Sequence, residues 1–201
     1  MSSRALTSRG RADHAVQIER KLHHADGGSS DAHTAEKLMA QALQECPESG
    51  LLWSAHIAMA PRQVRKSRCA DALKRCDKDA RVVCAVARLF WADGKIDKAR
   101  SWLKRAVDLA PDDGDAWALL YRFEKAQAAK ARSTNGAGDA VAGVVEACHK
   151  ASPKHGDAWQ RVAKDPALWE WDPAWKGRST DERIERLLEL VADVIAQDDV
   201  S

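Results

Sequence analysis

The sequence lacks the patterns on which covalent cross-links, metal centres and membrane insertion depend. Its five cysteines, in 201 residues, form no Cys-x-x-Cys pair and have no histidine at a zinc-type spacing. They predict reduced, small apolar residues of an intracellular protein. No run approaches the roughly 18 apolar residues that a membrane-spanning helix needs, and no signal-peptide core is present. We therefore expect neither a metal nor a membrane partner. The cysteines are Cys46, Cys69, Cys76, Cys84 and Cys148.

Sequence motifs of catalysis are also missing. Glycines occur in turns and do not form the GxGxxG or GxxxxGK patterns that bind phosphates. The sequence shows no nucleophile motif, no paired-carboxylate signature and no quartet of metal ligands. We therefore expect no enzymatic activity, no cofactor and no small-molecule substrate.

The sequence lacks a strong excess of either charge. The 32 Lys and Arg residues outnumber the 30 Asp and Glu residues, so the formal net charge is +2. Such a small net charge argues against strong non-specific binding of nucleic acid over the whole surface. Residues 62–78 are nevertheless basic, with seven cations against two acids. A solvated helix face is the simplest interpretation of this run. The alternative is contact with RNA or an acidic partner through Arg62, Arg65, Lys66, Arg68, Lys74 and Arg75.

What the sequence does contain is a repeated turn, Pro-x-x-Gly-x-x-Trp. It occurs three times, as PESGLLW, PDDGDAW and PKHGDAW. The first two copies are 64 residues apart, and a degenerate copy lies between them, with Asp77, Ala80 and Val83 in the Pro, Gly and Trp positions. The signature residues of the three full copies are Pro47, Gly50, Trp53, Pro111, Gly114, Trp117, Pro153, Gly156 and Trp159.

Apolar residues on both sides of these turns follow the period of a helix. From Lys95 to Glu124 they recur at steps of three and four before and after Pro111, which predicts a helical hairpin. A small residue precedes each Pro position by five residues, as expected where two helices cross closely. Repeats of roughly 30 to 42 residues, each a helix pair, predict an all-α, right-handed α-solenoid. The small residues are Ala42, Ala72, Ala106 and Cys148.

The expected organisation has three parts: a disordered N-terminus at 1–10, about five hairpin repeats at 11–178 with the first one truncated, and an amphipathic capping helix and tail at 179–201. The second helix of the truncated repeat is expected at 34–45. The stretch Ala126 to Gly138 is rich in Ala, Ser, Asn and Gly and predicts a loop insertion. The final helix begins with Ser179-x-x-Glu182, the pattern of a capping box.

Residue types within the repeat resemble the half-a-TPR (HAT) signature, a TPR-like repeat. Longer runs, including AEKLMAQALQECPESGLLWS and AVARLFWADGKIDKARSWLKRAV, resemble the C-terminal repeats of the pre-mRNA-processing factor 6 family. The resemblance covers roughly Val16 to Val194. Because that family has many more repeats, the resemblance implies that this chain corresponds to its tail alone. The residues that carry the HAT signature are Ala99, Arg100, Arg105, Ala106, Trp117, Tyr121 and Glu124.

The resemblance implies a protein–protein scaffold of the spliceosome that helps to assemble the tri-snRNP in the nucleus. It implies tri-snRNP proteins as partners, with RNA bound only indirectly or weakly. Two alternatives remain open: a HAT or TPR-like module of another RNA-processing or chaperone assembly, and direct RNA binding through residues 62–78. A chaperone clamp would need several Lys, Arg and Asn residues on the first helices, which here offer Arg88, Arg122 and Lys125 and no Asn.

Overall fold

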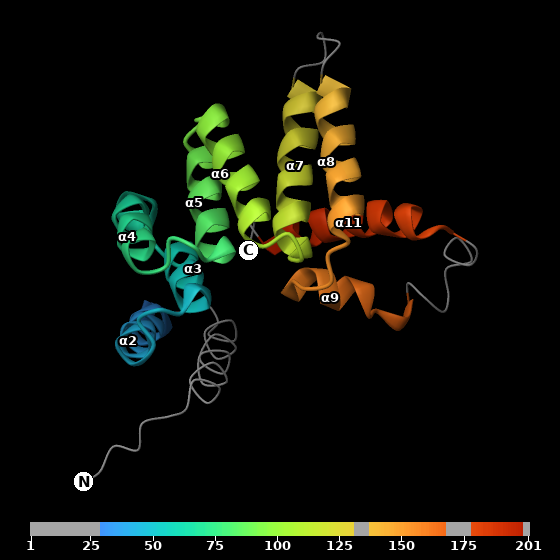
Figure 1. Ribbon diagram of the computed structural model, residues 1–201. Coiled ribbons are helices and arrows are strands. Elements are labelled where there is room, and N and C mark those ends of the chain that lie inside the picture. Colours follow the sequence, from blue (N-terminus) through green and yellow to red (C-terminus); the bar gives the residue numbers. More distant parts are fainter. Residues whose placement is uncertain (1–28, 131–136, 168–177, 199–201) are drawn as a thin grey trace. The chain divides into compact units, whose positions relative to one another are not determined.

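The computed structural model of the protein describes residues 29–130, 137–167 and 178–198, and these residues form α-helices without any β-strand (Figure 1). The predicted all-α fold of helix pairs is confirmed. The expected disordered N-terminus and the first helix of the truncated repeat lie outside the described residues. The helices are α2 (Ser29–Glu45), α3 (Gly50–Ala58), α4 (Arg62–Arg75), α5 (Ala80–Ala92), α6 (Ile96–Leu109), α7 (Gly114–Lys130), α8 (Ala137–Ala151), α9 (Asp157–Ala163) and α11 (Thr180–Asp198).

The helices fall into two compact units that divide between Asp93 and Gly94. In the first unit, α3 packs against α2, α4 and α5, and α4 packs against α5. Met39, Ala42 and Leu52 form a buried cluster between α2 and α3. Close packing at this crossing depends on the small side chain of Ala42, which is 1% exposed.

In the second unit, α7 is the central helix. It packs against α6, α8, α9 and α11, and α11 runs across α7 and α8 (Figure 1). A helix surrounded in this way must be apolar on most of its faces. The sequence meets this requirement, because the stretch Ala116 to Tyr121 is buried without interruption and Phe123 is fully buried.

The final helix combines a polar cap with one apolar face. The backbone N–H of Ser179 donates to Glu182 Oε2 at 2.8 Å, and the backbone N–H of Glu182 donates to Ser179 Oγ at 3.3 Å, which is the geometry of a capping box. The apolar face packs against α7, α8 and α9. Its buried residues are Ile184, Leu187, Leu188, Val191, Ala192 and Ile195.

Three helix boundaries differ from the sequence-based expectation. The predicted loop insertion from Ala126 to Gly138 is wrong at both ends, because α7 continues to Lys130 and α8 begins at Ala137. Ala, Gln and Lys are strong helix formers, so the stretch after Glu124 extends α7. The helix expected at 34–45 begins earlier, at Ser29. Composition alone therefore predicted longer loops than the structure has, both before α2 and between α7 and α8.

Within the ranges that the structure describes, no helix is both long and apolar enough to cross a membrane. The same residues contain no group of three or more His, Cys, Asp or Glu side chains placed to hold a metal ion.

Candidate partner-binding surface

The tryptophan of the repeated turn closes the turn on itself. Trp53 Nε1 donates to the carbonyl oxygen of Pro47 at 2.8 Å, and Trp117 Nε1 donates to that of Pro111 at the same distance. The Trp117 side chain is buried and that of Trp53 is half-buried. Each indole therefore combines apolar packing with a satisfied N–H group, as buried tryptophans usually do. These two residues serve the fold.

The glycine of the turn allows the following repeat to approach closely. Gly50 and Gly114 are the first residues of α3 and α7. A Cβ atom at Gly50 would lie 2.0 Å from the Asp79 carboxyl group, and one at Gly114 would lie 2.1 Å from the ring of Trp159. Because no real Cβ atom tolerates such distances, both positions require glycine as long as the neighbouring side chain stays in place.

The turns that precede α7 and α9 bind each other through their backbones. The N–H of Gly114 donates to the carbonyl oxygen of His155 at 2.8 Å. In return, the N–H groups of Lys154 and His155 donate to the carbonyl oxygen of Asp112 at 3.0 and 2.9 Å. Repeated turns are therefore a contact surface between successive repeats as well as a helix connection.

A carboxylate from one turn completes the next helix. The two oxygens of Asp115 accept hydrogen bonds from the backbone N–H groups of Trp159, at 2.7 Å, and Ala158, at 3.1 Å, in the first turn of α9. Burial raises the pKa of Asp115, although these hydrogen bonds act to lower it. This contact was missed at the sequence level. The recurrence of Gly-Asp-Ala-Trp in both turns was the signal that could have suggested it.

The remaining signature residues lie on the hairpin of α6 and α7 or in the turn before α9. Ala99 and Ala106 are fully buried, and Tyr121 is 5% exposed. The Arg105 guanidinium lies over the Trp102 ring at 5.2 Å from its centroid. Pro153 is buried, and Gly156 precedes α9 with φ of +117°, a conformation that favours glycine.

A charged side chain recurs at one position of the second helix in three successive repeats. We call it the seam position. It lies fourteen residues before the position that glycine occupies in the full copies of the next turn. That position is Gly50, Ala80, Gly114 or Gly156 in the successive turns. In α2, α4 and α6 its occupant forms an ion pair with a residue later in the chain. These occupants are Glu36, Lys66 and Arg100.

The ion pair between Arg100 and Glu124 joins α6 to α7. Arg100 Nε and Nη2 donate to the two oxygens of Glu124 at 2.6 and 3.0 Å. The Glu124 side chain is 4% exposed, whereas that of Arg100 is 33% exposed and lies 5.3 Å from the Phe123 ring centroid. The hydrogen bond to Glu124 raises the pKa of Arg100. This geometry gives Glu124, a polar residue in an apolar helix, a structural role.

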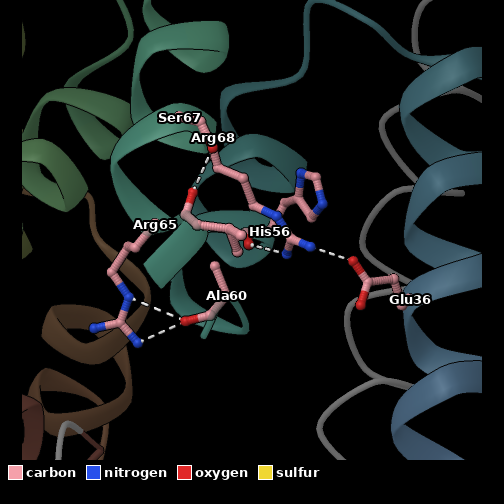
Figure 2. A network of polar contacts seen from close by, with 7 residues as sticks. Glu36, His56, Ala60, Arg65, Ser67 and Arg68 are labelled. Carbon is pink, nitrogen blue, oxygen red and sulfur yellow. Dashed lines mark hydrogen bonds and ion pairs between the residues drawn. The ribbon is translucent and has the colours of Figure 1, made fainter. Parts of the chain in front are cut away.

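Two arginines of the basic run complete the C-terminal end of α3 (Figure 2). Arg65 Nη2 and Nε donate to the carbonyl oxygen of Ala60 at 2.9 and 3.2 Å. Arg68 Nη1 donates to the carbonyl oxygen of His56 at 3.1 Å, and its Nη2 donates to Glu36 of α2. Carbonyl groups at the end of a helix have no partner within the helix, so these guanidinium groups supply the missing donors.

The other cations of the run divide into paired and unpaired residues. Lys66 pairs with Asp93 at 2.9 Å, and Lys74 pairs with Asp71 at 3.0 Å. Arg62, Arg75 and Lys78 are exposed and have no side-chain hydrogen bond or ion pair with any residue that the structure describes. Arg62 and Arg75 begin and end α4, so their backbones are about 20 Å apart. Four of the six predicted contact residues are thus held by contacts within the chain.

Comparison with known proteins identifies the repeat. The tetratricopeptide repeat family matches residues 85–123, which include α6 and parts of α5 and α7. "Pre-mRNA-processing factor 6" of Homo sapiens is 45% identical over 109 residues, covering 54% of this chain and 11% of that protein. "Pre-mRNA-splicing factor prp1" of Schizosaccharomyces pombe is 40% identical over 127 residues, covering 63% and 13%.

A plant relative matches the chain to a similar extent. "Protein STABILIZED1" of Arabidopsis thaliana is 49% identical over 105 residues, covering 52% of this chain and 9% of that protein. The chain thus spans about a tenth of the length of these curated relatives. The chain therefore contains a repeat region similar to that of pre-mRNA-processing factor 6: the similarity covers 54% of the chain, and the tetratricopeptide repeat family matches residues 85–123.

Proposed function

We propose that the chain is a non-catalytic protein–protein scaffold that acts in pre-mRNA splicing. The observation that carries this proposal is the identity of 40–45% to proteins named as pre-mRNA processing and splicing factors, over more than half of the chain. The repeat geometry supports it. Its recurring residues close turns and join helices, and stacked hairpins offer a broad surface to other proteins.

The partners that we propose are proteins of the tri-snRNP, bound in the nucleus. In this proposal about five hairpin repeats form the binding surface, and α11 caps their C-terminal end. RNA reaches the chain through these proteins, because four of the seven cations in the basic run are occupied by contacts within the chain. Arg62, Arg75 and Lys78 are the three cations of this run that remain for a direct contact with RNA.

Affinity purification of the tagged full chain from nuclear extract tests the proposal. Tri-snRNP proteins should be recovered both before and after RNase treatment, whereas small nuclear RNA should be recovered only before it. The double variant Arg62→Ala/Arg75→Ala is the matched control, and it should recover the same proteins. Failure to recover any spliceosomal protein would refute the scaffold. Loss of all bound proteins after RNase treatment would favour direct RNA binding instead.

A further inference from the structure

A histidine lies at the point where α2 is joined to the hairpin of α3 and α4. His56 belongs to α3, and its backbone carbonyl oxygen accepts a hydrogen bond from Arg68 Nη1 of α4 at 3.1 Å. The other terminal nitrogen of Arg68, Nη2, donates to Glu36 of α2. One guanidinium group therefore links α2 to α3, and the imidazole of His56 lies beside this link (Figure 2).

The surroundings of the His56 ring suit the neutral imidazole. The ring lies against Trp53, with 5.9 Å between the two ring centroids. His56 Nδ1 is buried and has no hydrogen-bond partner among the residues that the structure describes. A neutral imidazole can carry its single proton on Nε2, whereas the imidazolium carries an N–H group at both nitrogens. Protonation of His56 would therefore bury an N–H donor that has no acceptor.

The charges around His56 also oppose a proton on the ring. Helix α3 packs against α2, α4 and α5. Burial lowers the pKa of His56 from its ordinary value of 6.5, the charge of Arg68 on α4 lowers it further, and Glu36 of α2 acts in the opposite direction. Helix α5 carries two charged side chains, Arg81 and Arg88, and neither is among the charges that shift this pKa. The net effect favours the neutral ring.

The preference for a neutral ring makes the contact depend on pH. When α2 and α4 separate from α3, the His56 ring enters water and binds a proton with the ordinary pKa of about 6.5. Because the pKa is lower in the closed contact, protons bind more strongly to the open state and favour it. The contact is therefore fully stable above pH 6.5, and it is weakened as the pH falls through 6.5 toward the lower pKa of the closed state.

We propose that His56 is a pH-sensitive switch of the first unit, in which the neutral ring leaves the Arg68 link between α2 and α3 in place and protonation opens it. The imidazolium would repel the Arg68 guanidinium that holds the two helices together. Histidine is the side chain whose charge changes between pH 5 and 8, so mild acidification is sufficient.

An NMR titration of the full chain measures the proton affinity of His56. Its ring protons should titrate with a midpoint below 6.5. The midpoint should rise in Arg68→Met, which removes the neighbouring cation, and fall further in Glu36→Gln, which removes the opposing carboxylate. A midpoint at or above 6.5 in the natural chain, or no change in either variant, would overturn the proposal.

Hydrogen exchange of the backbone amides of α2 measures the opening itself. At pH 5.5 a histidine with a pKa of 6.5 is protonated in about ten of eleven open molecules, so protection corrected for intrinsic exchange should fall up to about tenfold between pH 7.5 and 5.5. His56→Phe keeps a ring against Trp53 and removes the titrating group, so its α2 protection should be equal at both pH values.

His155→Phe, at an exposed histidine of the second unit, is the matched control and should show the same loss of α2 protection as the natural chain. Unchanged protection of the natural chain between the two pH values would overturn the proposal. An undiminished loss in His56→Phe would do the same. If His56→Phe does not fold, the titration midpoint of the natural chain decides.

Discussion

In the first unit, the contact between α3 and α4 depends on arginines that bind backbone carbonyl groups, whereas in the second unit the contact between α6 and α7 depends on a buried carboxylate and a large apolar core. Arg65 and Arg68 supply donors to the end of α3. Arg100 instead pairs with Glu124, beside the buried Phe123. The comparison shows that the repeat determines where two helices are joined, but the residues of each copy determine how strongly.

The largest difference between the units should appear when the turn tryptophans are truncated. Trp117→Ala should lower the free energy of unfolding by about 3–5 kcal/mol, because it removes a large buried side chain. Trp53→Ala should cost about 1–2 kcal/mol, because Trp53 is only half-buried. Chemical denaturation of the full chain measures both. Equal losses would mean that the two turns are equally buried, contrary to this comparison.

Breaking the buried ion pair should have the next largest effect. Arg100→Met should cost about 3 kcal/mol, because it leaves the Glu124 carboxylate buried without its partner. Arg68→Met should cost about 1–2 kcal/mol, because Glu36 is exposed and remains solvated. The same unfolding measurement applies. The comparison fails if the Arg68 substitution proves to be the more costly of the two.

The stability cost of replacing the turn glycine should also be larger in the second unit, at Gly114, than in the first unit, at Gly50. Gly114→Ala should cost about 1–3 kcal/mol, because the added methyl group meets the buried ring of Trp159. Gly50→Ala should cost about 1 kcal/mol, because the Asp79 carboxylate can move aside at the expense of its capping bond to the Arg81 N–H. Gly143→Ala is the control. Nothing lies within 4 Å of its added methyl group, so it should stabilise α8 by roughly 0.5–1 kcal/mol.

The smallest expected effect concerns the reactivity of the cysteines and leaves stability unchanged. Burial raises the pKa of Cys148 to about 12 and that of Cys69 to about 11, so both remain almost entirely protonated at pH 8. Since the thiolate is the reactive form, alkylation of the folded chain at pH 8 should label the half-buried Cys46 before Cys148. Mass spectrometry of partly labelled protein gives the order. Early labelling of Cys148 would show that α8 is less well packed than described.

The sequence predicted the helix pairs because turn residues and apolar periodicity repeat together. Ala80 illustrates this, since its degenerate turn was identified from spacing alone and α5 begins there. The contacts between helices were not predicted in the same way. The recurring Gly-Asp-Ala-Trp could have suggested that Asp115 binds the next turn. Arg65, in contrast, binds the carbonyl oxygen of Ala60 after α3, and backbone acceptors leave no sequence pattern of their own. The basic run was correctly located as a helix, but composition could not show which of its cations were already occupied.

The salt dependence of RNA binding tests most directly whether the cations of α4 act within the fold. For a single-stranded RNA, the logarithm of the binding constant falls with the logarithm of salt concentration by about 0.7 for each phosphate contact. With Arg62, Arg75 and Lys78 as the three unpaired cations of the run, the purified chain should bind weakly with a slope of about −2.1. The triple variant Arg62→Glu/Arg75→Glu/Lys78→Glu should abolish this dependence. A slope near −5, as expected for about seven phosphate contacts, would show that the whole run binds RNA and would contradict the structural role assigned to it.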